Sequence, residues 1–236
     1  MICLNFFSTV AAYALTFLHL KRIYQKSFRG QYLYVFSILC SLPSIIWAMS
    51  QLCWKAVMFW AFSGLISLGY AIPIRGKTLR NIPSLKIFLI ALVWSCMIAG
   101  IPLENNDMLS ASSKFFLSVS IFLYVLGLTV PFDIRDIDND PPSLRSLPQC
   151  WGIKRSKCFA VICLLCSGTL LWNYPEALPP AKWAYITTIC VATGLIAWAS
   201  PKRKNWYYTL LIEGCSLLPW ILMKFFIFFS LRESTI

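Results

Sequence analysis

The chain has 236 residues, of which 58% are hydrophobic, 16% aromatic and only 13% charged. Charged residues usually make up about a quarter of a soluble domain, so this composition excludes an ordinary soluble enzyme and a disordered chain. A mean hydropathy of +0.68 is typical of an integral membrane protein. The net charge of +12 would raise nucleic acid as a partner of a soluble protein. Here the basic residues lie between apolar segments, so we expect no nucleic-acid partner.

Apolar stretches long enough to cross a membrane follow one another along the whole chain. A spanning helix needs about 20 mostly apolar residues. Eight stretches meet this requirement, at about 2–20, 32–50, 53–74, 84–103, 113–132, 157–174, 182–200 and 206–230. We therefore expect an all-α polytopic transmembrane helix bundle of about eight spans, folded as a single domain over residues 1–236.

The basic residues alternate from one connection to the next. Four connections, at 21–31, 75–86, 133–157 and 201–205, contain 16 of the 21 lysines and arginines. The connections between them hold very few. By the positive-inside rule the basic loops are cytoplasmic, and both termini then lie on the outside.

An acidic cluster follows the fifth apolar stretch. Four of the nine acidic residues lie within eight positions, at Asp133, Asp136, Asp138 and Asp140. In a helix, residues 133, 136 and 140 would share one face and repel one another, a penalty that a divalent cation removes. Carboxylate oxygens suit Mg²⁺, which also binds substrate phosphates. The alternative is that these are ordinary solvated acids that pair with Arg135 and Arg145.

The wider segment PFDIRDIDNDPPSLRSLPQCWG resembles the second aspartate-rich motif of the UbiA superfamily of intramembrane prenyltransferases. Asp133, Asp136 and Asp140 match its acids, the stretch 145–148 matches its basic Leu-Pro segment, and Gly152 matches its glycine. Ser143 stands where a glycine is usual. The segment LRNIPSLKIFLIALVWS at 79–95 also looks like the central part of a divergent bacterial branch.

This resemblance implies a helical bundle in the bacterial inner membrane, with a lipid-facing cavity for an isoprenyl diphosphate. Asp133, Asp136 and Asp140 are then the catalytic, metal-binding residues that hold Mg²⁺ against the diphosphate, and Arg145 contacts the phosphate oxygens. The metal stabilises the leaving group, and a lipid or aromatic acceptor attacks the isoprenyl carbocation. Aromatic residues such as Tyr124 then line the cavity, or simply pack between helices.

The sequence departs from this family in two respects. Family members typically have nine spans, and the first apolar stretch here resembles their second helix, so we expect the first helix to be absent. The first acidic motif is also missing, because TVAAYALTFLHLKRIYQKSFRG contains no acid. Lys21 and Arg22 in that loop then bind the diphosphate directly, or only reflect the positive-inside rule.

Two functions from different classes follow. The first is a Mg²⁺-dependent UbiA-like prenyltransferase. The second is a catalytically inactive protein of the same fold that binds an isoprenoid, another lipid or a membrane partner. A small-solute transporter is a weaker third, since we find no convincing internal repeat.

Overall fold

The computed structural model describes residues 39, 42–43, 45–47, 49–72, 78–106 and 108–233. Every regular element in these ranges is helical, which confirms the all-α prediction. The chain divides into two compact units. The first contains the described residues up to Ile82 together with Cys96–Leu109, and the second contains Pro83–Ser95 and the residues from Ser110 onward. The expected span 2–20, most of 32–50, and Lys21 and Arg22 lie outside the described residues.

The first unit is built around one long helix. α3 (Trp54–Ala71) packs against the π-helix η2 (Cys96–Gly100) and the short helix α5 (Ile101–Glu104), while η1 (Leu79–Asn81) packs on α3. The start of α3 is tied to the end of α5, because the Cys53 amide donates to Asn105 Oδ1 at 2.8 Å. The expected span 53–74 is therefore helical over 18 residues.

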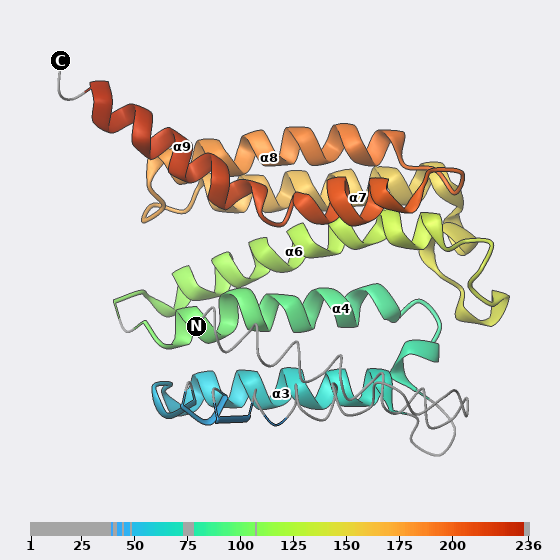
Figure 1. Ribbon diagram of the computed structural model, residues 1–236, viewed down its shortest axis with the longest axis horizontal. Coiled ribbons are helices and arrows are strands. Elements are labelled where there is room, and N and C mark those ends of the chain that lie inside the picture. Colours follow the sequence, from blue (N-terminus) through green and yellow to red (C-terminus); the bar gives the residue numbers. More distant parts are fainter. Residues whose placement is uncertain are drawn as a thin grey trace. The chain divides into compact units, whose positions relative to one another are not determined.

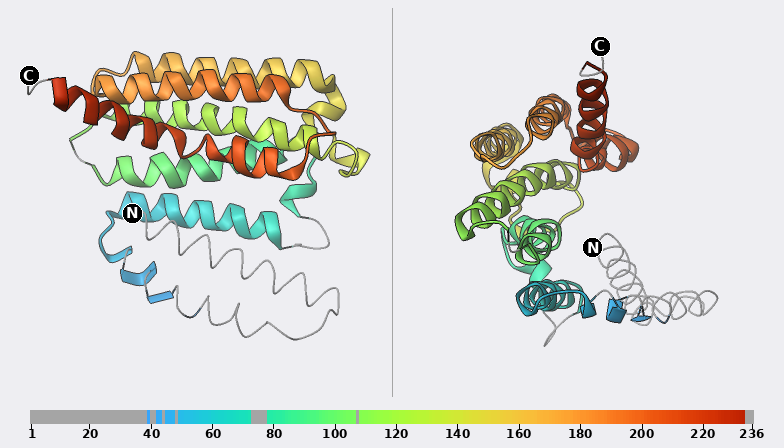
Figure 2. Two further views of the ribbon diagram at one scale, coloured as in Figure 1. Left: turned by 45° about the horizontal axis from the view of Figure 1, so that its top comes forward. Right: turned by 90° about the vertical axis from the view of Figure 1, so that its left-hand side faces the viewer.

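The second unit is a bundle in which α6 (Ala111–Arg135) lies between α4 (Lys86–Ser95) and α7 (Leu147–Trp172), as Figures 1 and 2 show. α8 (Pro179–Trp198) packs on α7, and α9 (Leu218–Glu233) packs on α8. The π-helix η4 (Tyr207–Ile212) contacts both α6 and α8, and the 3-10 turn η3 (Pro142–Leu144) connects α6 to α7.

Small residues allow α6 and α7 to approach closely. A Cβ at Gly127 would lie 2.9 Å from the Ala160 carbonyl oxygen, so only glycine fits there. About two helical turns away from this contact, Ser120 on α6 faces Ser167 on α7. Ser120 Oγ donates to the Ser167 carbonyl at 2.9 Å, and Ser167 Oγ donates to the Ser120 carbonyl at 2.6 Å. Small and hydroxylated side chains of this kind are typical of helix contacts in membranes, where no hydrophobic effect drives the helices together.

Four helices are long and apolar enough to cross a membrane: Lys86–Glu104, Ala111–Arg135, Leu147–Trp172 and Pro179–Trp198. They coincide with the stretches expected at 84–103, 113–132, 157–174 and 182–200. Large apolar side chains point outward from them, including Phe115, Ile162, Leu165 and Trp198. This outward apolar surface would be a liability in water and suits a lipid environment.

The last expected span, 206–230, is helical but not continuous. The two helical residues that follow η4 end at Gly214, residues 215–217 form a turn, and α9 begins at Leu218. The break leaves backbone carbonyls without helical partners, and the Tyr124 hydroxyl donates to one of them, the Cys215 carbonyl, at 2.6 Å. Tyr124 is 5% exposed. It therefore has a packing role that supports a broken helix.

Candidate functional site

The acidic cluster lies where α6 ends. Ser113 in the first turn of α6 and Asp133 in the last are separated by 20 positions, which at 1.5 Å per residue is roughly 30 Å, the thickness of a bilayer's hydrocarbon core. The helix ends at Arg135, and the chain then makes a tight turn in which the amides of Asn139 and Asp140 both donate to the Asp136 carbonyl, at 2.9 and 2.8 Å. Because the helix stops at Arg135, residues 133, 136 and 140 do not share one helix face.

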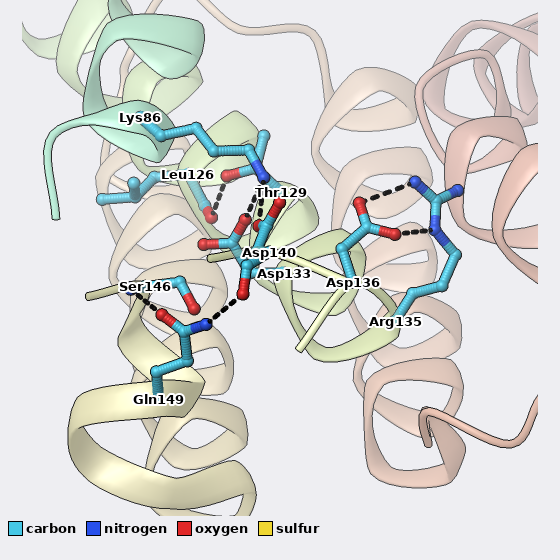
Figure 3. Close-up of polar contacts among 9 residues, drawn as sticks. All are labelled: Lys86, Leu126, Thr129, Asp133, Arg135, Asp136, Asp140, Ser146 and Gln149. Carbon is cyan, nitrogen blue, oxygen red and sulfur yellow. Dashed lines mark hydrogen bonds and ion pairs between the residues drawn. The ribbon is translucent and has the colours of Figure 1, made fainter. Parts of the chain in front are cut away.

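Asp133 and Asp140 converge on a single cation, Lys86, the first residue of α4. Lys86 Nζ lies 2.9 Å from Asp133 Oδ1 and 3.0 Å from Asp140 Oδ2 (Figure 3). The three side chains are largely buried: Lys86 is 11% exposed, Asp133 3% and Asp140 10%. The site is therefore a compact ionic cluster of two carboxylates and one ammonium at the end of the bundle.

The helix directions explain why these charges meet. Ser95 Oγ donates to the Ser118 carbonyl at 3.0 Å, while Lys86 pairs with Asp133, so α4 and α6 run antiparallel. The cation at the start of α4 thus lies beside the carbonyl end of α6, and the anion at the end of α6 lies beside the amide end of α4. Each charge is unfavourable at its own helix terminus and favourable at the neighbouring one.

One carboxylate oxygen of the cluster depends on Lys86 alone. Asp133 Oδ1 lies 2.9 Å from Lys86 Nζ, and no second donor reaches it within the described part of the chain. The ion pair with Lys86 therefore provides the whole compensation of this buried oxygen.

The chemistry of these oxygens fits Mg²⁺, although a lysine lies between them. Hard carboxylate oxygens are the ligands that Mg²⁺ prefers. Over residues 49–72, 78–106 and 108–233, however, no group of three or more His, Cys, Asp or Glu side chains is placed to hold one metal ion. A divalent cation at Asp133 and Asp140 would therefore have to share these carboxylates with Lys86 or take its place.

Asp136 points away from this cluster and pairs with Arg135. The Arg135 guanidinium makes two parallel hydrogen bonds to it, with Nε 2.7 Å from Oδ1 and Nη2 2.9 Å from Oδ2. Arg135 also lies 5.3 Å from the ring centroid of Phe132 and 5.6 Å from that of Tyr208. The two-pronged pair and the stacking fix this arginine against η4, on the other side of α6 from Lys86 (Figure 3).

The connection from Asp140 to α7 is held by backbone-directed hydrogen bonds. Gln149 Nε2 donates to the Asp140 carbonyl at 2.9 Å, and its Oε1 accepts from the Ser146 amide at 3.0 Å (Figure 3). Ser84, just before α4, donates its hydroxyl to the Arg145 carbonyl at 2.8 Å and its amide to the Leu144 carbonyl at 3.0 Å. The segment that carries Asp140 is thus fixed to the start of both α4 and α7.

Two residues in this contact have left-handed backbone conformations. Ser84 has φ 59° and Arg145 has φ 45°, and both are non-glycine residues. Such conformations cost energy and persist only where the surroundings impose them, and they cluster at functional sites. The Arg145 side chain itself is exposed, and it has no ionic or hydrogen-bonding partner among the side chains described here.

The backbone conformation explains why the matched motif has a glycine at position 152. Gly152 has φ 77° and ψ 162°, a combination that is essentially restricted to glycine, and it kinks α7 in its second turn. A Cβ there would meet no atom within 4 Å, so the backbone angle and not the available space demands glycine.

The structure thus brings together two of the six residues expected from the sequence, Asp133 and Asp140. Asp136 lies close by but faces Arg135. Arg145 is held by the hydrogen bond from Ser84 to its backbone carbonyl, and its exposed side chain is free to reach a ligand. Lys21 and Arg22 lie outside the described residues.

Sequence reasoning missed the central residue, Lys86, which it counted only among the basic loop residues. It also missed Ser84 and Gln149. The available signal was a lysine directly before an apolar span, inside the segment at 79–95 that carries part of the family resemblance. A cation at a helix start and an acid at the end of a neighbouring antiparallel helix are expected to meet.

An open pocket with a mostly apolar lining lies at the opposite end of the same helices. Ser113, Phe116, Thr169 and Asn173 line it, and Ser113 Oγ lies 3.1 Å from both carboxylate oxygens of Glu176. Burial, reinforced by Glu176, raises the pKa of Tyr174, which also lines this cavity. None of the residues expected at the diphosphate site takes part in it.

Comparison of the chain with protein-family models, with curated proteins and with solved structures gives no match.

Proposed function

We propose that this chain is a UbiA-like integral membrane prenyltransferase of about eight spans, which transfers an isoprenyl group from an isoprenyl diphosphate to a lipid or aromatic acceptor. The observation that carries the proposal is the ionic cluster itself. The segment that resembles the family motif, 133–152, folds into a compact corner in which Asp133 and Asp140 face one cation at the end of membrane-length helices.

The distribution of charge supports a phosphate-binding role at this end of the second unit. Basic side chains gather at the start of α7 and after α8, where Lys157 Nζ donates to the Ala197 carbonyl at 2.7 Å. Further exposed cations follow at Lys154, Arg155, Lys202, Arg203 and Lys204. Under the positive-inside rule this end faces the cytoplasm of a bacterial inner membrane, and both termini lie outside.

In the proposed reaction, the bond between isoprenyl C1 and the diphosphate oxygen breaks, and its electron pair leaves with the diphosphate. The acceptor supplies the electron pair for the new bond to C1 and then loses a proton. Mg²⁺, when bound, would neutralise the charge that grows on the leaving diphosphate. Asp133 and Asp140 would hold it, with Asp136 as a further ligand once it is freed from Arg135. Arg145, Lys21 and Arg22 would contact phosphate oxygens.

A second candidate function is favoured by one specific observation. Lys86 and Arg135 already pair with the three expected metal ligands. A chain that has exchanged its metal for fixed cations would keep an isoprenoid-binding fold without catalysis. This second function predicts binding of an isoprenoid or another lipid without release of diphosphate.

The two candidates are separated by a turnover experiment. Protein in lipid nanodiscs is incubated with an isoprenyl diphosphate labelled at C1, Mg²⁺ and a bacterial lipid extract, and both diphosphate release and label in the lipid product are measured. The proposal predicts both, with loss in Asp133→Asn/Asp140→Asn. The matched control is Asp138→Asn, because Asp138 lies exposed in the same turn. Label retained on the nanodiscs without diphosphate release would favour the second candidate, and the absence of retained label, of released diphosphate and of labelled product would contradict both functions.

A further inference from the structure

Two cations from different elements meet at the end of α8. Lys157 on α7 donates from Nζ to the Ala197 carbonyl at 2.7 Å. Arg203, in the connection that follows α8, donates from Nε to the Trp198 carbonyl at 3.3 Å. The carbonyl end of a helix carries partial negative charge, so each cation stabilises this end of α8. Because the two carbonyls belong to adjacent residues, the ammonium and the guanidinium also lie near each other and repel.

The end of α8 compensates only a small part of this positive charge. A helix terminus carries about half an elementary charge, whereas Lys157 and Arg203 each carry a full one. Among the described residues, the ion pairs involve only the cations Lys86 and Arg135, so no acidic side chain there neutralises Lys157 or Arg203. Most of the N–H groups of the two cations also remain without an acceptor in these ranges. A further anion is therefore favoured at this place.

Aromatic side chains at the same place indicate its depth in the membrane. The Arg203 guanidinium lies 5.7 Å from the ring centroid of Tyr207, and the Tyr207 and Trp206 rings are 6.4 Å apart. Trp206 is 55% exposed, and Trp198, the last residue of the membrane-length helix α8, is 70% exposed. Exposed tryptophans at the end of a spanning helix are typical of the boundary between hydrocarbon and water. The two cations thus lie at the level of the lipid headgroups.

We propose that Lys157, Arg203, Trp198 and Trp206, together called the α8 corner, bind the headgroup of an anionic phospholipid. The lipid phosphate accepts from the free N–H groups of both cations, a charge-assisted contact. The exposed tryptophans flank the part of the lipid where its acyl chains begin. A soluble phosphate would use only the cations, and a zwitterionic lipid would bring a positive group toward them. None of the residues of the ionic cluster at Lys86 takes part, so this inference does not depend on the proposed function.

The test measures lipid binding to the full-length protein in detergent micelles by native mass spectrometry. Phosphatidylglycerol is the anionic probe, and phosphatidylcholine is the zwitterionic one. Wild type is compared with Lys157→Gln/Arg203→Gln and with the control Lys202→Gln/Lys204→Gln, which removes the same two charges from exposed positions beside Arg203. Wild type should bind phosphatidylglycerol more tightly than phosphatidylcholine. The variant of the α8 corner should lose roughly tenfold or more of the affinity for phosphatidylglycerol, and the control less than about threefold.

Three results would overturn the inference. Equal losses in the two double variants would show that only the total charge matters. Equal affinities of wild type for the two lipids would remove the anionic preference. Displacement of phosphatidylglycerol by inorganic phosphate at the same concentration would show that the α8 corner binds free phosphate instead of a lipid.

Single substitutions keep the inference testable if Lys157→Gln/Arg203→Gln does not fold. Arg203 and Lys204 are both exposed, so Arg203→Gln and Lys204→Gln form a matched pair that leaves the packing intact. Arg203→Gln should weaken phosphatidylglycerol binding roughly fivefold. Lys204→Gln should leave it nearly unchanged, and the same affinity in both variants would contradict a defined site at the α8 corner.

Discussion

Lys86 and Asp133 form an ion pair across two antiparallel helices, with Nζ 2.9 Å from Oδ1 and side chains that are 11% and 3% exposed. Because both charges are removed from solvent, neither is stable without the other. The pair therefore joins α4 to α6 at the point where Asp140 also reaches the same ammonium.

Removal of the lysine should destabilise the second unit more than removal of a surface cation. We expect Lys86→Met to lower the free energy of unfolding by about 3–5 kcal/mol, because it leaves two buried carboxylates uncompensated. Lys86→Arg should retain most of the stability. Lys202→Met is the control, since Lys202 is exposed. Denaturant titration in detergent micelles measures the difference, and equal effects of the two methionine substitutions would contradict the buried pair.

Gly152→Ala should destabilise the protein through the backbone alone. The position has φ 77° and ψ 162° with open space around it, so alanine would cost about 1–3 kcal/mol in strain. Gly194→Ala is a matched control, and we expect it to increase the stability of the protein instead of lowering it. Gly194 lies within α8, also in open space, where alanine favours the helix by up to about 1 kcal/mol. Thermal unfolding of the two variants should shift in opposite directions, and a shift in the same direction would be inconsistent with the kink.

Gly127→Val should separate α6 from α7. A Cβ at this position already lies 2.9 Å from the Ala160 carbonyl oxygen, which is backbone and cannot rotate away. Overpacking of this kind costs about 1–3 kcal/mol. A double substitution with a residue on α7 would not relieve the clash, because the obstructing atom belongs to the main chain. An unchanged melting temperature in Gly127→Val would show that the two helices are further apart than described.

Tyr124→Phe should affect stability and leave diphosphate binding unchanged. The hydroxyl donates to the Cys215 carbonyl at the break between η4 and α9, so its loss leaves a buried acceptor unpaired at a cost of about 1–3 kcal/mol. If the Tyr124 ring instead stabilised a carbocation, Tyr124→Phe would keep both its melting temperature and its turnover, because the ring remains, and Tyr124→Leu would lose turnover. Parallel measurement of the two quantities distinguishes the roles.

Much of the fold could be predicted because helix length and apolar composition are local properties. The stretches at 84–103, 113–132, 157–174 and 182–200 all correspond to helices of membrane-spanning length. Hydropathy gives no signal for the break after Gly214, since the residues on both sides are equally apolar. Pro219 gives a local one, because it has no N–H to donate to the Cys215 carbonyl four residues earlier. The donor that this carbonyl finds instead, the Tyr124 hydroxyl, is distant in the sequence and was not predictable.

The candidate site was predictable only in part for a related reason. Spacing along the chain placed Asp133, Asp136 and Asp140 on one helix face, but the helix ends at Arg135 and the turn sends Asp140 toward α4. The partner of each carboxylate is set by tertiary packing: Lys86 comes from another helix, whereas Arg135 is the immediate neighbour of Asp136. Mg²⁺ at these acids stays a prediction, and the titration described next tests it.

The most direct test of the central claim is an equilibrium titration of the purified protein with a fluorescent isoprenyl diphosphate, with and without Mg²⁺. Wild type, Asp133→Asn/Asp140→Asn and the control Asp138→Asn are compared. The account predicts Mg²⁺-dependent binding in wild type and Asp138→Asn, and its loss in the double variant. Binding that is absent from wild type, or indifferent both to Mg²⁺ and to the double substitution, would contradict a diphosphate site at the end of α6.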